Sequence, residues 1–259
     1  MRGPGPGSKT KGLFWLAAAL LVGGAAALGV PFLARQIPWS VETRLAALQK
    51  GLPEIQECDR APHRKAFALL EKTVRRVYPL YPSDKDFPIQ VKVIRGKTVN
   101  AFAFLGGQVF VYEGLLKQTE SAEELAGILA HEIEHVRRCH IIQGVLVRLM
   151  TVGALKMVFT GSGALDPKLA EALLNLHFSR EQEQEADEGA LQRLHDGGVD
   201  VAGFENFFRR AENMTTVPTL LSDHPANEAR VQMAQRFPAA ASPPIMSRAE
   251  WALVKNSCQ

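Results

Sequence analysis

The chain has 259 residues, of which 46% are apolar and 22% are charged, a composition typical of a globular protein with one sizeable core. Its formal charge of +3 comes from basic residues scattered among acidic ones, which excludes nucleic acid as an expected partner. The three cysteines form no CxxC pair, which excludes a zinc ribbon and a thioredoxin-type motif, so any metal must be held by histidines and carboxylates.

The first predicted element is an apolar segment near the N-terminus. Residues 12–34 contain no charged side chain and follow a basic leader. Such a segment can cross a bilayer as a helix, which takes about 20 apolar residues. The pattern also fits a cleaved signal peptide, with small residues at Ala25 and Ala27 as the cleavage site. In both cases the residues after Ala34 lie outside the cytoplasm. They are either anchored to a membrane, on the periplasmic side of the inner membrane in a bacterium, or released as a secreted or periplasmic protein.

Two helices and a small sheet are predicted next. The stretches 41–50 and 61–78 carry apolar residues at helical spacing. Prolines then break the helical pattern, and three short runs rich in β-forming residues follow. The last two runs flank Gly106-Gly107, a pair that favours a hairpin turn. The predicted strands cover residues 89–95, 101–105 and 109–112.

The rest of the chain is predicted to be mostly helical. Ser121 and Glu124 form a capping-box pattern, which indicates that a helix begins there. The apolar stretch 141–160 contains Arg148 and Lys156, each at a cost of about 2.5–3.5 kcal/mol at mid-bilayer, which favours a core helix over a second membrane span. The predicted fold class is α+β, mostly α, with a small sheet. Further helices are predicted over 165–195 and 201–213 and, after a Pro/Ala linker at 237–244, from a cap at Ser247 to Glu250.

The residues His131-Glu-Ile-Glu-His135 form an HExxH motif inside the helix that begins at the capping box. His131 and His135 are four residues apart, so they lie on one helical face, where both imidazoles can reach one metal ion. Glu132 lies one step round the helix, beside the metal, as a general base would. A polar helix with two surface histidines has the same pattern. The apolar residues before the motif indicate instead a helix in the core, where histidines without partners would be costly.

A catalytic zinc ion takes three protein ligands and leaves one position open for water. The metzincin motif HExxHxxGxxH is excluded, because Arg138 and Ile141 occupy the positions of its glycine and its third histidine. His140 follows His135 by five residues, so we expect it to point away from the histidine pair and to have a structural role.

A later predicted helix offers candidates for the third ligand. Glu183 and Asp187 lie on a stripe of mostly apolar residues, and carboxylates that face a core need a compensating charge. A zinc ion with its histidines provides that charge, so Glu183 is the predicted third ligand and Asp187 the acceptor of a second N–H from a ligand histidine. The alternative is an ion pair with Arg180 or with the Arg137-Arg138 pair. The other members of the stripe are Leu173, Leu176, Arg180, Ala190 and Leu194, and the acids on the other faces are Glu181, Glu185 and Glu188.

Several motifs together resemble metallopeptidase family forty-eight, which includes HtpX, the CAAX prenyl endopeptidase, the OMA-type mitochondrial protease and BepA. The resemblance implies a gluzincin-type domain in which the glutamate of ExxxD, here Glu183, is the third zinc ligand. It also implies that the strand around Asn100 lines the substrate cleft and that His224 lies over the metal. One departure is Asp223, where threonine is usual. The matching residues are Asn100-Ala101, Gly107 with Val109 to Leu115, His131 to His135, Ser179-Arg180 with Glu183, Ala186 and Asp187, and His224-Pro225 with Arg230.

The sequence therefore predicts an endopeptidase with one Zn²⁺ per chain, which hydrolyses protein or peptide substrates at or near a membrane, in envelope protein quality control. Glu132 is expected to take a proton from the attacking water and to pass it to the leaving amine. His224 is the candidate donor to the oxyanion, or else it blocks the open metal position. The alternative function is a non-catalytic chaperone or assembly factor stabilised by zinc, which would not need the base Glu132.

Three segments are expected: an anchor or signal segment at 1–34, a metallopeptidase domain at 35–237, and a linker with a short helix at 238–259. Cys58 and Cys258 could form a disulfide in an oxidising compartment, which would leave Cys139 free.

Overall fold

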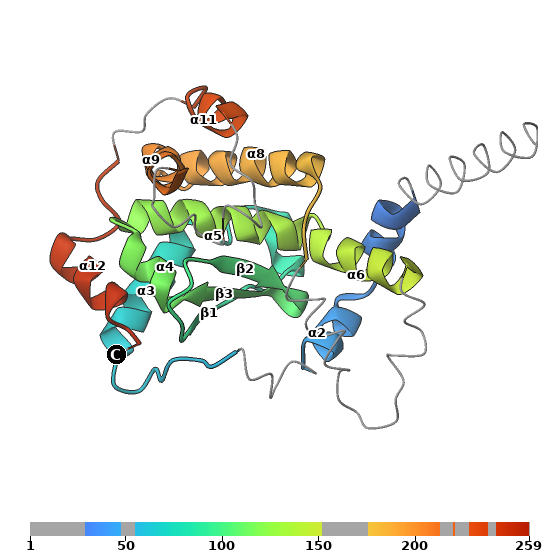
Figure 1. The fold of residues 1–259 in the computed structure, drawn as a ribbon, viewed down its shortest axis with the longest axis horizontal. Helices are drawn as coiled ribbons and strands as arrows, with labels where there is room; N and C mark the ends of the chain where they lie inside the picture. The colour runs from blue at the N-terminus through green and yellow to red at the C-terminus, as the bar shows by residue number, and fades with distance from the viewer. Residues whose placement is uncertain are drawn as a thin grey trace, which may run out of the picture.

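The computed structural model describes residues 29–47, 55–151, 176–212, 220, 228–237 and 242–258. These residues are mostly helical with one small sheet, which confirms the predicted fold class at this level (Figure 1). The helices are α2 (Trp39–Ala47), α3 (Arg64–Val77), α4 (Glu113–Gln118), α5 (Ala122–Arg137), α6 (His140–Thr151), α8 (Arg180–Asp196), α9 (Ala202–Glu212), α11 (Glu228–Ala234) and α12 (Arg248–Lys255), with 3-10 turns η1 (Pro82–Asp86) and η2 (Leu105–Gly107).

Of the predicted apolar segment at residues 12–34, the part up to residue 28 lies outside the described residues. Residues 29–36 are helical. In the part of the chain that the structure describes, no helix combines the length and the apolar character that a membrane crossing requires.

The sheet has the strand order β1-β3-β2. Strand β1 (Gln90–Ile94) runs parallel to β3 (Gln108–Tyr112), and β2 (Ala101–Phe104) runs antiparallel to it. The predicted hairpin is confirmed, because β2 and β3 are joined through η2, where Gly106 has a φ of 68°, a conformation that other residues rarely adopt. Because β2 is last in the strand order, it is an edge strand of the sheet.

Helix α5 lies between the sheet and α8 (Figure 1). All residues from Glu124 to Val136 are buried, which confirms that the HExxH helix belongs to the core. The Oγ of Ser121 accepts the N–H of Glu124 at 3.2 Å, so the predicted helix start is confirmed. The reciprocal half of the capping box differs, because the Glu124 carboxylate accepts the N–H of Glu120 at 2.8 Å and binds Arg210.

Helix α8 begins at Arg180, so the prediction of one continuous helix over 165–195 is wrong for residues 176–179, which are not helical. The reason is local: the Oγ of Ser179 accepts the N–H of Gln182, and the Gln182 side chain accepts the N–H of Ser179. This capping box satisfies the helix end. Leu176 therefore precedes the helix, and Leu173 lies outside the described residues.

Helix α6 follows α5 after a short break. Its residues Ile141, Ile142 and Val145 are buried in an apolar cluster that includes Phe104 and Phe110 of the sheet. The core-helix interpretation therefore holds for the first half of α6, whereas Val147 is exposed and 152–160 lie outside the described residues.

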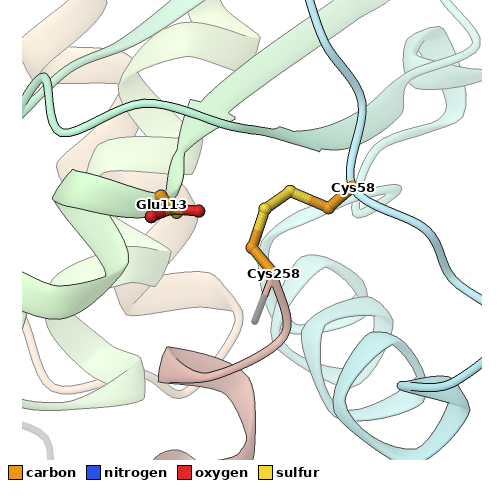
Figure 2. Close-up of side chains that lie close together, drawn as sticks. All are labelled: Cys58, Glu113 and Cys258. Atoms are coloured by element: carbon orange, nitrogen blue, oxygen red, sulfur yellow. A yellow bond between two sulfur atoms is a disulfide. The ribbon is translucent and has the colours of Figure 1, made fainter.

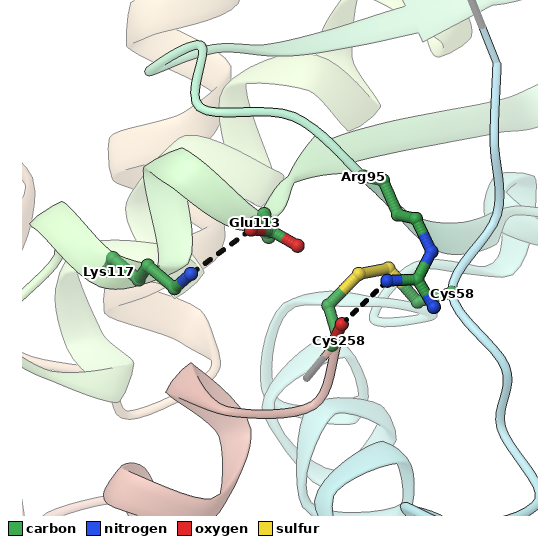
Figure 3. Close-up of a disulfide and its surroundings, with 5 residues drawn as sticks. All are labelled: Cys58, Arg95, Glu113, Lys117 and Cys258. Atoms are coloured by element: carbon green, nitrogen blue, oxygen red, sulfur yellow. Dashed lines mark hydrogen bonds and ion pairs between the residues drawn. A yellow bond between two sulfur atoms is a disulfide. The ribbon is translucent and has the colours of Figure 1, made fainter.

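A disulfide joins Cys58 to Cys258, across 200 residues of sequence, and Cys139 is free and buried, as the sequence suggested. The bridge ties the C-terminal end of the chain to the segment beside β1, where the N–H of Cys58 donates to the carbonyl of Val93 at 2.9 Å. Arg95 Nη1 donates to the carbonyl of Cys258 at 3.0 Å (Figure 3). Glu113 of α4 lies beside the bridge (Figure 2), but the sulfurs are bonded to each other and are not available as metal ligands.

Candidate metal centre

Two helices bring the predicted metal ligands together. Helix α5 supplies His131 and His135, and the neighbouring helix α8 supplies Glu183 and Asp187. All four side chains are buried. The spacing of four residues within each helix places both members of each pair on one face, and the packing of α8 on α5 turns these faces toward each other.

The candidate donor groups of His131, His135 and Glu183 lie close to one another. The Nε2 atoms of His131 and His135 are 3.0 Å apart. The carboxylate oxygens of Glu183 lie 3.5 Å from Nε2 of His131 and 3.4 Å from Nε2 of His135. Donors bound to one zinc ion at 2.0–2.1 Å in tetrahedral geometry are separated by roughly 3.3 Å. These three residues could therefore hold one metal ion.

The hydrogen bonding of His131 and the charge around it also suit the binding of a cation. Nδ1 of His131 lies 2.9 Å from Oδ1 of Asp187, and a carboxylate accepts only, so the ring proton is on Nδ1. In the neutral ring, Nε2 is then the nitrogen with a lone pair, and this atom faces His135. The carboxylates of Glu132, Glu183 and Asp187 and the guanidinium of Arg230 together carry a formal charge of −2, which a divalent cation would neutralise.

Arg230 of α11 binds both acids of α8. Its Nε donates to Oδ2 of Asp187 at 2.6 Å, and its Nη2 donates to Oε2 of Glu183 at 3.2 Å. The guanidinium also lies over the ring of Phe208, 4.3 Å from the centroid. Arg230 belongs to the motifs that carry the family resemblance, but no role was predicted for it. The ion-pair partners expected for Glu183 and Asp187 were Arg180, Arg137 or Arg138, and the ion pair is instead made by Arg230.

Glu132 is fully buried and is held at the sheet edge. Its Oε2 accepts the N–H of Ala103 at 2.8 Å. Because this N–H is bonded to Glu132, it lies on the open side of β2 rather than in the ladder with β3. The carboxylate of the expected base is thus placed between the helix that carries the histidines and the edge strand.

His140 contradicts the expectation that it points away from the histidine pair. Its Nδ1 lies 3.0 Å from Nδ1 of His135, and its Nε2 lies 3.4 Å from Oε2 of Glu185. The prediction is wrong because it extended α5 past its end: α5 ends at Arg137, Cys139 has a φ of 59°, and α6 then begins at His140. Burial lowers the pKa of His140 to about 4, so this ring is neutral at neutral pH.

A second buried network joins the two helices beside this centre. Arg193 of α8, with no exposed surface, donates to Oε1 of Glu134 at 2.7 Å and makes two bonds to Asp84 at 2.8 and 3.0 Å. Burial alone would raise the pKa of Asp84, but Arg193 and the N–H groups of Leu80 and Tyr81 lower it to about 2. The same guanidinium outweighs the effect of burial at Glu134 and lowers its pKa.

The remaining predicted residues have separate outcomes. Glu181, Glu185 and Glu188 are exposed, so the assignment of the acids to faces of α8 is confirmed, whereas Arg180, which was placed on the buried stripe, is exposed. Asn100 is buried directly before β2, and its carbonyl accepts the N–H of Tyr112 at 3.1 Å. His224 lies outside the described residues.

Comparison with known proteins agrees with this geometry. The profile of peptidase family M48 matches residues 65–237. The chain is 31% identical over 155 residues to the metalloprotease LoiP of Escherichia coli, covering 56% of this chain and 61% of LoiP. It is 30% identical over 165 residues to the beta-barrel assembly-enhancing protease of Yersinia pestis, covering 57% and 34%. The mitochondrial metalloendopeptidase OMA1 of Schizosaccharomyces pombe is 30% identical over 162 residues, with 59% and 47% covered. The chain thus spans less than two thirds of the length of each of these relatives.

Proposed function

The chain belongs to peptidase family M48, and we propose on this premise that it is a zinc-dependent endopeptidase with one zinc ion per chain. His131, His135 and Glu183 would hold the metal, and Glu132 would be the general base. The observation that carries this proposal is the cluster of three buried donor side chains, whose nitrogen and oxygen atoms lie 3.0 to 3.5 Å apart. An HExxH helix paired with a glutamate from a second helix supports a gluzincin-type domain over 35–237, flanked by the segments 1–34 and 238–259.

Bound zinc would lower the pKa of a coordinated water to about 7 and polarise the scissile carbonyl. Glu132 would accept the proton of the attacking water and then deliver it to the nitrogen of the leaving amine. Asp187 would hold the Nδ1–H of His131, so that Nε2 of this ring faces the metal. Because the family resemblance implies that His224 lies over the metal, we propose this residue as the donor to the oxyanion.

The substrate would bind as an extended peptide along β2. This strand is at the edge of the sheet, and the Ala103 N–H on its open side is already directed at Glu132. Addition of a substrate strand there would bring the scissile bond next to the base, because both lie at the same edge. Asn100, which directly precedes β2, would contact the substrate in this arrangement.

We place the catalytic domain outside the cytoplasm, tethered by the apolar segment 12–34 or released after its cleavage. The disulfide between Cys58 and Cys258 supports an oxidising compartment. One relative is named a beta-barrel assembly-enhancing protease, which supports misassembled envelope proteins as the substrate class.

The test uses purified chain, metal analysis and a casein-degradation assay with and without a chelator. We expect one zinc ion per chain and chelator-sensitive cleavage. Glu132→Gln should keep the metal and lose cleavage by several orders of magnitude, because Glu132 is a base and not a ligand. Glu183→Gln should lose both metal and activity.

Glu181→Gln is the matched control, because Glu181 is exposed on the same helix and should bind no metal. Zinc loss in Glu132→Gln, or full zinc content in Glu183→Gln, would contradict the assigned roles. Cleavage that persists in Glu132→Gln would contradict the mechanism, and zinc binding by a wild-type chain without any proteolysis would favour a zinc-stabilised assembly factor.

A further inference from the structure

The ligand candidate His135 is held on two sides by residues that the HExxH motif does not include. The ring of Phe178, just before α8, stacks on its imidazole with centroids 3.9 Å apart and planes 22° apart. The Nδ1 of His140 lies 3.0 Å from Nδ1 of His135, within hydrogen-bond distance. Both histidines are buried, with exposed fractions of 0% and 2%.

The direction of this hydrogen bond follows from the metal centre. Nε2 of His135 is the atom that faces His131 and Glu183, so it must carry a lone pair to bind a metal. A neutral imidazole has one N–H, so the proton of His135 is on Nδ1 and is donated to Nδ1 of His140. The other nitrogen of His140 then carries its proton toward Oε2 of Glu185, a carboxylate oxygen 3.4 Å away.

We propose that His140 is a positioning residue for the metal centre, which fixes the tautomer and the ring orientation of His135 by accepting its Nδ1–H. This inference rests on the proposed zinc site. His140 thereby does for His135 what Asp187 does for His131, and the two ligand rings have acceptors of different charge, one a carboxylate and one an imidazole.

Two substitutions separate this role from simple packing. His140→Leu retains a comparable bulk but removes the acceptor, which leaves the Nδ1–H of His135 buried without a partner. His140→Asn loses ring volume but keeps an acceptor, because its Oδ1 occupies the place of Nδ1. A positioning role makes the leucine variant the worse metal binder, whereas a packing role makes the asparagine variant the worse one.

The experiment measures the zinc dissociation constant of the full oxidised chain by competition with a chromophoric chelator. We expect His140→Leu to weaken zinc binding by about 10- to 100-fold and His140→Asn to remain within about threefold of wild type. His195→Leu is the control: His195 is half-exposed on α8 and contacts Asp196, and zinc affinity should not change.

Equal affinity of His140→Leu and wild type, or weaker binding by His140→Asn than by His140→Leu, would overturn the assignment. If the leucine variant does not fold, the asparagine variant decides, since a tenfold loss in it contradicts a role carried by the acceptor atom. A wild-type chain that binds no zinc would overturn the proposed function and this assignment together. Zinc binding by wild type with an unaffected leucine variant would overturn the assignment alone.

Discussion

Replacing Arg193 with methionine should destabilise the fold strongly, because this guanidinium is the main counter-charge for two buried carboxylates. Arg193 makes four hydrogen bonds, to Glu134 Oε1, to the carbonyl of Val77 and twice to Asp84. Neither Asp84 nor Glu134 exposes more than 2% of its surface. Methionine fills much of the same volume but leaves these acids in the core without that partner.

The expected loss is about 3 kcal/mol at pH 7, the lower end of the range for breaking a buried ion pair. The lower end applies because Arg137 also contacts both acids, at 2.7 Å from Asp84 and 2.8 Å from Glu134. Part of this loss is pH-dependent. The pKa of Asp84 is about 2 in the folded chain against an ordinary 3.8, which corresponds to roughly 2 kcal/mol of stability.

The sign of the pH effect follows from the lowered pKa. Asp84 stabilises the folded state fully above about pH 4, and this contribution disappears as the pH falls toward 2. The variant keeps Arg137 and the N–H groups of Leu80 and Tyr81 on Asp84 but loses the part that Arg193 supplies. The difference in the free energy of unfolding from wild type should therefore narrow as the pH falls across this interval, by at most about 2 kcal/mol.

Urea unfolding of both proteins, with the disulfide intact, measures the difference in the free energy of unfolding. Arg209→Met is the control, because Arg209 forms an exposed pair with Glu205 on α9, and its loss should stay within about 0.5 kcal/mol. A loss below about 1 kcal/mol in Arg193→Met at pH 7, or a difference that does not change with pH, would refute this reasoning.

Two further predictions concern the bridge and the metal centre. Reduction of the disulfide between Cys58 and Cys258, which closes a loop of 200 residues, should lower the free energy of unfolding by about 2–5 kcal/mol. Urea unfolding with and without dithiothreitol measures this change. A midpoint that dithiothreitol does not change in wild type would count against the prediction. So would an equal effect of dithiothreitol on a variant with both Cys58→Ser and Cys258→Ser, which has no bridge to reduce. Asp187→Asn should weaken zinc binding by about 10-fold, since it removes the charge that holds the Nδ1–H of His131. Chelator competition checks this, and unaltered affinity would remove Asp187 from the support of the metal.

Residues whose role depends on helical periodicity could be predicted from the sequence. His131 with His135 and Glu183 with Asp187 are each four residues apart, and the structure buries each pair on one face, as expected. The face shared by Glu183 and Asp187 was predicted correctly although α8 begins later than expected, because both residues lie within its unbroken helical range, Arg180–Asp196. The cap at Ser247 was predictable for the same reason, since its partner is only three residues away.

Residues whose partners are distant in sequence could not be found in this way. Arg193 binds acids 59 and 109 residues away, and Arg230 binds acids 43 and 47 residues away. Arginine is rarely buried, so both residues would be expected at the surface, and nothing in the neighbouring sequence indicates otherwise. The parallel pairing of β1 with β3 was missed for a related reason, since strand order is set by packing between segments and not within one.

By itself the sequence determined which side chains share a helical face, because 3.6 residues per turn fix that relation within any unbroken helix. It could not determine where the helix breaks or which faces meet. The left-handed conformation of Cys139 turns His140 back onto His135, and the packing of α8 on α5 brings Glu183 within 3.5 Å of both candidate ligand histidines. These contacts depend on the sum of many weak interactions across the core, so only the tertiary structure decided them.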